Sequence, residues 1–143
     1  MGYFHLQSTR PQTLAYSLND SPAGQLAWIV EKFHDWTDQP VDRDHLLTSI
    51  SVTWFTGTGA TSAHATYDGI KAWRQMLAAD TAQSHTGPPT GVGVFAADTT
   101  IRALMDPVEE MHWSNFDRGG HFPAMETPDL LTADLRAFFR PLR

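Results

Sequence analysis

Two residues with complementary chemistry, Asp98 and His121, each follow a stretch with the character of a strand. Asp98 comes just past the apolar run at 92–95, and His121 follows two glycines at 119–120 that come after the alternating stretch 111–116. Residues that follow neighbouring parallel strands meet at one sheet edge, where α/β folds place their sites. An acid can hold the histidine tautomer there, so that its other nitrogen takes a proton from water or a hydroxyl. A helix-capping Asp98 and a turn-lining His121 are the alternatives.

The sequence around this pair predicts a strand, a helix, a second strand and a final helix, in that order. The run at 92–95 is typical of a strand buried on both faces. Residues 99–110 can form the crossover helix of a parallel connection, although Pro107 should end it early. Thr127 and Pro128 should cap a final helix, which presents one apolar stripe. That stripe consists of Leu131, Leu135 and Phe138.

Helices are predicted to fill most of the preceding chain. Ser21 followed by Pro22 is a strong helix start, and apolar residues repeat at helical spacing to about residue 35. A second helix should open after residues 42–44 and break near the glycines at 57 and 59. A shorter helix is expected over 11–18, and another should carry Tyr67.

The predicted sheet is incomplete as it stands. Two buried parallel strands do not form a stable sheet alone, because their unpaired edges and apolar faces need neighbours. We therefore expect a missing N-terminal half or a homo-oligomer to complete the sheet.

Composition limits the classes of function. The 143 residues are 41% hydrophobic, which is enough for a real core, and the net charge is −6 with Lys and Arg scattered singly. We therefore expect no nucleic-acid partner. No apolar run approaches the length of a membrane span, so we expect a soluble, cytoplasmic protein without a membrane partner. Cysteine is absent and the histidines lack zinc-site spacing, so we expect no metal site.

Four phrases in collinear order resemble the epoxide hydrolases of the microsomal type and their bacterial relatives. The histidine motif RGGHF at 118–122, continued to residue 139, resembles the end of that family. The phrases at 2–14, 20–33 and 46–58 resemble its earlier part in the same order. The resemblance therefore spans nearly the whole chain.

The resemblance implies an α/β fold, specifically the C-terminal half of an α/β-hydrolase. Residues 1–86 would form the helical lid, and residues 87–143 would form the last two parallel strands and the final helix. The family converts an epoxide and water to a vicinal diol without a cofactor, so the implied partner is a small-molecule epoxide.

The resemblance also implies roles for four residues. In that family an aspartate opens the oxirane, two lid tyrosines donate hydrogen bonds to its oxygen, and a histidine with an acid activates water to hydrolyse the resulting ester. His121 matches the histidine and Asp98 matches its acid. Tyr3 matches the first tyrosine. Tyr67 would be the second, although it falls one position late when counted from Trp54.

One departure from the family pattern limits what this chain can do alone. No Gly-x-Asp-x-Gly or Gly-x-Ser-x-Gly nucleophile elbow occurs in the sequence. We therefore expect an epoxide hydrolase-like segment that is inactive by itself. The alternatives are another α/β-hydrolase, such as an esterase or dehalogenase, and a non-catalytic fragment or assembly partner.

Overall fold

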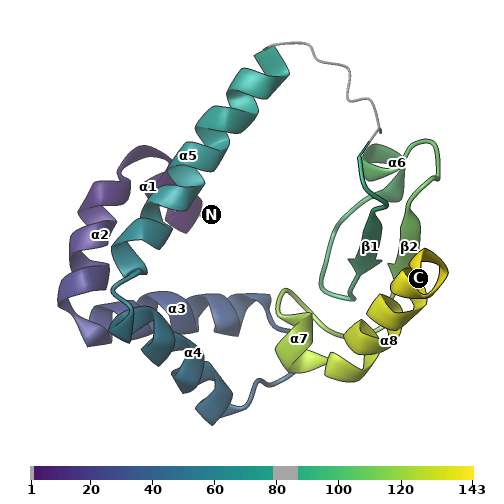
Figure 1. The fold of residues 1–143 in the computed structure, drawn as a ribbon. Helices are drawn as coiled ribbons and strands as arrows, with labels where there is room; N and C mark the ends of the chain where they lie inside the picture. Colours follow the sequence, from purple (N-terminus) through teal and green to yellow (C-terminus); the bar gives the residue numbers. More distant parts are fainter. Residues whose placement is uncertain (1, 79–86) are drawn as a thin grey trace. The chain divides into compact units, whose positions relative to one another are not determined.

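The computed structural model describes residues 2–78 and 87–143, which divide into two compact units (Figure 1). The first unit contains residues 2–31 and 46–78, and the second contains Lys32–His45 and 87–143. The segment Lys32–His45 thus groups with the C-terminal residues, although it precedes the expected boundary at residue 86. The described chain is mostly helical and contains two parallel strands.

Five helices form the N-terminal part of the chain. They are α1 (Gly2–Thr9), α2 (Pro11–Asp20), α3 (Pro22–Trp36), α4 (Arg43–Phe55) and α5 (Gly59–Ala78). The four helices predicted from the sequence correspond to α2 to α5, whereas α1 was not predicted. As expected, the Ser21 hydroxyl caps α3 by accepting a 3.0 Å hydrogen bond from the Gly24 N–H. Among the described helices, none combines the length and apolar character that a membrane crossing requires.

The core of the first unit lies between α2 and α5. Leu14, Ala15 and Leu18 of α2 are buried against Ala63 of α5. The two helices approach closely because α5 begins with a glycine: a Cβ at Gly59 would lie 2.9 Å from the Leu18 carbonyl oxygen. Helix α1 packs against this pair, and its Leu6 contacts the same core.

The second unit is built on a two-stranded parallel sheet. Strand β1 (Gly91–Val94) pairs in register with β2 (His112–Asn115), which confirms the predicted parallel connection. The other elements of this unit beyond residue 87 are α6 (Arg102–Met105), α7 (Pro123–Glu126), α8 (Pro128–Phe139) and the 3-10 turn Arg140–Leu142. Helix α8 packs against β1.

Three predictions about this unit were wrong. Strand β1 is exposed or half-buried rather than buried on both faces, because within the described residues the sheet has only two strands. The crossover helix predicted over 99–110 shrinks to the four residues of α6, ahead of Pro107. Thr127 does occupy the predicted N-cap position of α8, ahead of Pro128, but its side chain does not cap the helix: it is buried, and its hydroxyl donates to the Pro123 carbonyl of α7 at 3.5 Å.

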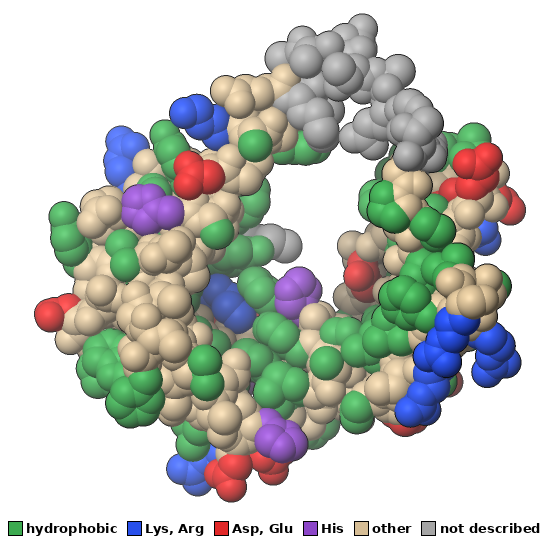
Figure 2. All heavy atoms as spheres, viewed as in Figure 1, with side chains coloured by type: hydrophobic (Ala, Val, Ile, Leu, Met, Phe, Trp, Pro, Cys, Tyr) green, Lys and Arg blue, Asp and Glu red, His purple; other side chains and the backbone are tan. Residues whose placement is uncertain are grey.

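A group of basic side chains marks the C-terminal end of the chain. Figure 2 shows blue Lys and Arg atoms gathered there, and Arg136, Arg140 and Arg143 surround one small hollow. This corrects the expectation that the basic residues are scattered singly. Positive charge at the end of α8 is favourable, because the carbonyl end of a helix carries a partial negative charge.

Candidate active site

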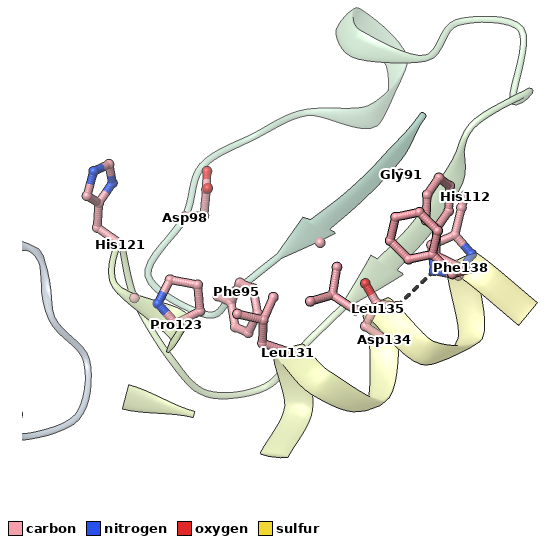
Figure 3. Close-up of a pocket in the computed structure, with 13 residues that line it drawn as sticks. Gly91, Phe95, Asp98, His112, His121, Pro123, Leu131, Asp134, Leu135 and Phe138 are labelled. Atoms are coloured by element: carbon pink, nitrogen blue, oxygen red, sulfur yellow. Dashed lines mark hydrogen bonds and ion pairs between the residues drawn. The ribbon is translucent and has the colours of Figure 1, made fainter. Parts of the chain in front are cut away.

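A pocket of about 360 Å³ lies within the second unit, between the sheet and α8 (Figure 3). Its apolar part is lined by side chains such as Phe95, Leu135 and Phe138. Asp98 and His121 line the same pocket, and Figure 3 shows them together at one end. The structure thus places the two residues singled out from the sequence at a single concave surface, beyond the carboxyl ends of β1 and β2.

The Asp98 carboxylate is held by its own turn. Its Oδ1 accepts hydrogen bonds from the Thr100 hydroxyl and the Thr100 N–H, each at 2.7 Å. The hydrogen bond from the Thr100 hydroxyl is the main reason that the pKa of Asp98 lies below its ordinary value. Burial, the second-largest influence, opposes this shift, and hydrogen bonds from backbone N–H groups and the charge of the nearby His121 add to it. Asp98 is therefore ionised at neutral pH. It does not cap the following helix, because the N-cap of α6 is Ile101.

His121 is exposed and is held through its backbone. Its N–H donates to the Trp36 carbonyl at 2.9 Å, and its ring meets the Trp36 indole edge-on with centroids 4.9 Å apart. Within the described residues the imidazole nitrogens of His121 have no hydrogen-bond partner. The acid and the histidine are neighbours, and the orienting hydrogen bond between them is not formed.

Two glycines allow the His121 loop to take this position. Gly119 has a φ of +93°, and its carbonyl accepts from the Ala97 N–H at 3.1 Å, which ties the loop to the turn that carries Asp98. A Cβ at Gly120 would overlap the Trp36 carbonyl oxygen. The tight glycine turn predicted from the sequence therefore exists, and it also lets another segment approach the loop.

The two predicted lid tyrosines both belong to the first unit. Tyr3 is half-buried on α1, where its ring meets Phe4 edge-on, and Tyr67 is 40% exposed on α5. Helices α1 and α5 pack together. The tyrosines and the Asp98–His121 pair therefore form two groups in separate units.

One cluster at the pocket was not predicted. Nε2 of His112 on β2 lies 2.8 Å from Asp134 Oδ1 on α8, and the Ser114 hydroxyl lies 2.5 Å from the same oxygen. Serine, histidine and aspartate are all present, but Ser114 and Asp134 approach the same imidazole nitrogen. A catalytic triad needs them on opposite nitrogens, so this cluster ties α8 to β2. The alternation of His112 and Ser114 on one strand face was the only signal for it.

Among the described residues, no three histidine or acidic side chains lie close enough together to hold a metal ion. The carboxylates of the pocket are Asp98, on its turn, and Asp134, engaged by His112 and Ser114. Neither stands on a sharp strand-to-helix turn of the kind that exposes a hydrolase nucleophile.

Parallel strands that carry an acid and a histidine beyond their carboxyl ends, with helices alongside, define part of an α/β-hydrolase. No family model matches the sequence. An epoxide hydrolase homologue of Stigmatella aurantiaca is 40% identical over 153 residues, which cover 99% of this chain and 33% of that protein. Epoxide hydrolase 1 of Sus scrofa is 34% identical, covering 96% of this chain and 33% of its own length.

Two solved structures agree with these relatives. The Aspergillus niger epoxide hydrolase matches with a TM-score of 0.80 and 28% identity, covering 99% of this chain and 36% of that one. The juvenile hormone epoxide hydrolase of Bombyx mori matches with a TM-score of 0.81 and 28% identity, and the match covers 99% of this chain and 37% of that one. The chain is therefore homologous to part of the epoxide hydrolases of the microsomal and juvenile hormone type and corresponds to a fragment of their α/β-hydrolase fold. It spans about one third of the length of the relatives it matches, where the resemblance led us to expect a half.

Proposed function

We propose that this chain carries the water-activating part of an epoxide hydrolase, the C-terminal portion of the α/β-hydrolase core together with lid helices. The observation that supports this proposal most directly is the shared pocket of Asp98 and His121, in a chain homologous to epoxide hydrolases. An ionised acid beside an exposed imidazole is suited to general base catalysis, because the acid stabilises the imidazolium that forms.

In the proposed reaction, a carboxylate attacks one oxirane carbon, the C–O bond to that carbon breaks, and the alkoxide takes a proton from a tyrosine. His121 then removes a proton from water, whose oxygen attacks the ester carbonyl. The ester bond breaks, and the leaving alkoxide takes the second proton of the water from the new carboxyl group, which releases the diol and restores the carboxylate. The proton on His121 then returns to the tyrosinate. Asp98 keeps its charge throughout and stabilises the imidazolium.

Tyr3 and Tyr67 are the proposed proton donors to the oxirane oxygen. A strained ether is a poor leaving group until hydrogen bonds stabilise its developing negative charge. An esterase does not need these donors, so the tyrosines favour epoxides as the substrate class over carboxylic esters.

The attacking carboxylate is not provided by these 143 residues, since the sequence has no nucleophile elbow. That observation favours a second proposal for the chain taken by itself, namely a non-catalytic segment that binds or assembles without turnover. A full cycle then requires an aspartate from outside this sequence.

The deciding experiment measures diol formation from styrene oxide by the chain reconstituted with the nucleophile-bearing remainder of a homologous epoxide hydrolase, and by the same assembly carrying His121→Ala or His34→Ala. His34 is the matched control, because its side chain is 86% exposed and, among the residues that the structure describes, makes its one polar contact with the neighbouring Asp35. Turnover that survives in His34→Ala and disappears in His121→Ala supports the catalytic proposal. Equal turnover in both variants would remove His121 from the mechanism, and the absence of turnover in all three assemblies supports the non-catalytic one.

A further inference from the structure

The loop that presents His121 is tied to residues 36–39, a short segment that starts at the last residue of α3 and belongs to the same compact unit. The Trp36 carbonyl accepts the His121 N–H, and the Trp36 ring stands edge-on to the imidazole. Beside them, the Phe33 and Phe122 rings stack with centroids 3.9 Å apart. The position of the histidine therefore depends on a segment far upstream in the sequence.

Two carboxylates join the loop and the segment in reciprocal fashion. Glu126 Oε2 accepts the N–H groups of Asp38 at 2.7 Å and Gln39 at 3.0 Å, while its Oε1 accepts the Phe122 N–H at 2.9 Å. Asp38 Oδ2 accepts the Gly119 N–H at 2.9 Å. Each side thus offers a carboxylate to the backbone of the other, and we name Asp38 and Glu126 the carboxylate clamp.

The clamp acts on the part of the loop that is least constrained by its own side chains. Gly119 and Gly120 would leave the backbone before His121 free to adopt many conformations. Hydrogen bonds from backbone N–H groups to ionised carboxylates are stronger than neutral ones, and they fix both distance and direction. A side-chain hydrogen bond from Gln39, followed by the Gly119 N–H, lowers the pKa of Asp38, so this carboxylate is charged at neutral pH.

We propose that Asp38 and Glu126 are positioning residues that hold His121 beside Asp98 at the pocket. The inference rests on the proposed function of His121 as the water-activating base. Neither carboxylate touches the reacting atoms, and both act through the backbone at 119–122. A purely structural pair would instead support the whole unit, including the β1–β2 ladder.

The test compares the 143-residue chain with Asp38→Ala and Glu126→Ala by ¹⁵N NMR. The measured quantities are the exchange rates of the Gly119 and Phe122 amides and the nuclear Overhauser effect between the Trp36 and His121 rings. Asp38→Asn is the conservative variant, since its amide oxygen can still accept the Gly119 N–H. Asp117→Ala is the matched control, because Asp117 is an exposed acid just before the same glycines.

We expect the changes in amide exchange to be confined to the loop that presents His121. Asp38→Ala should speed exchange of the Gly119 amide by about tenfold or more. Glu126→Ala should speed exchange of the Phe122 amide by a similar factor. Both variants should weaken the contact between the Trp36 and His121 rings. Asp38→Asn should recover most of the protection, and Asp117→Ala should match the wild type. The amides of β1 and β2 should exchange at their original rates in every variant.

Two results would overturn the proposal. One is unchanged exchange and an unchanged ring contact in both alanine variants. The other is equal loss of protection in the loop and in the β1–β2 ladder, which would make the carboxylates general supports of the unit. These measurements need no turnover, so a failure of the clamp is distinguishable from a failure of the proposed function, which the styrene oxide assay decides.

Discussion

Replacing Gly120 by alanine should destabilise the second unit through a single methyl group. The added Cβ would overlap the Trp36 carbonyl oxygen and lie 2.8 Å from the Asp38 backbone nitrogen. Both obstacles are backbone atoms, which cannot rotate away as a side chain can. Overpacking of this kind costs about 1–3 kcal/mol, and separation of the two segments would also lose a hydrogen bond worth about 1 kcal/mol. The expected loss in free energy of unfolding is therefore about 2–4 kcal/mol.

Calorimetry of wild type, Gly120→Ala and Gly69→Ala measures this effect. A loss of 2–4 kcal/mol corresponds to a fall in Tm of roughly 4 to 16 °C for a chain of this size. Gly69 is the matched control: it lies inside α5 with no atom within 4 Å of an added Cβ, so alanine there should raise stability by about 1 kcal/mol. A Gly120→Ala protein that melts at the wild-type temperature would refute the steric reasoning.

Three further outcomes are expected. Thr100→Val removes the main hydroxyl donor to Asp98, so the pKa of Asp98 should rise toward the ordinary value of an aspartate in a ¹³C NMR titration. The stability contributed by the lowered pKa of Asp98 is fully present above the unfolded-state pKa and is lost as pH falls through the folded-state pKa, so in the variant this contribution and its dependence on acid pH should both shrink. Leu18→Ala, at a site 3% exposed, should cost about 2–5 kcal/mol in urea unfolding, whereas Leu104→Ala, at a site 78% exposed, should change stability by less than about 0.5 kcal/mol. Sedimentation should find the isolated chain self-associated, because the described sheet has two strands with unpaired edges; a monodisperse monomer with one cooperative melt would contradict this.

The helices and the parallel pairing could be predicted because their signals are local. Ser21 followed by Pro22 specifies a helix start by capping chemistry, and the Ser21 hydroxyl indeed accepts the Gly24 N–H. The same reasoning failed at Thr127, because Pro123 opens a short helix just before it and the buried hydroxyl faces that helix instead. A hydroxyl residue followed by proline does not reveal which of two adjacent helices receives the hydrogen bond of the side chain.

The candidate site was only partly predictable for a related reason. Asp98 and His121 could be paired because each follows a strand, and parallel strands place their ends together. The bonds from Asp38 to Gly119 and from Asp134 to His112 join residues 81 and 22 positions apart, and no periodicity in the sequence connects them. Such contacts are created by the tertiary fold, so they could not be predicted from the sequence.

The division of the second unit into two stretches of chain affects how the protein is made. Asp38 and Glu126 are 88 positions apart, so at about 5–20 residues per second a ribosome completes the second partner roughly 4 to 18 s after the first. Residues 2–31 and 46–78 of the first unit are all synthesised before residue 87. During synthesis the helical unit can therefore fold first, while Lys32–His45 waits without its native partners until the last strand, the histidine loop and α7 have emerged.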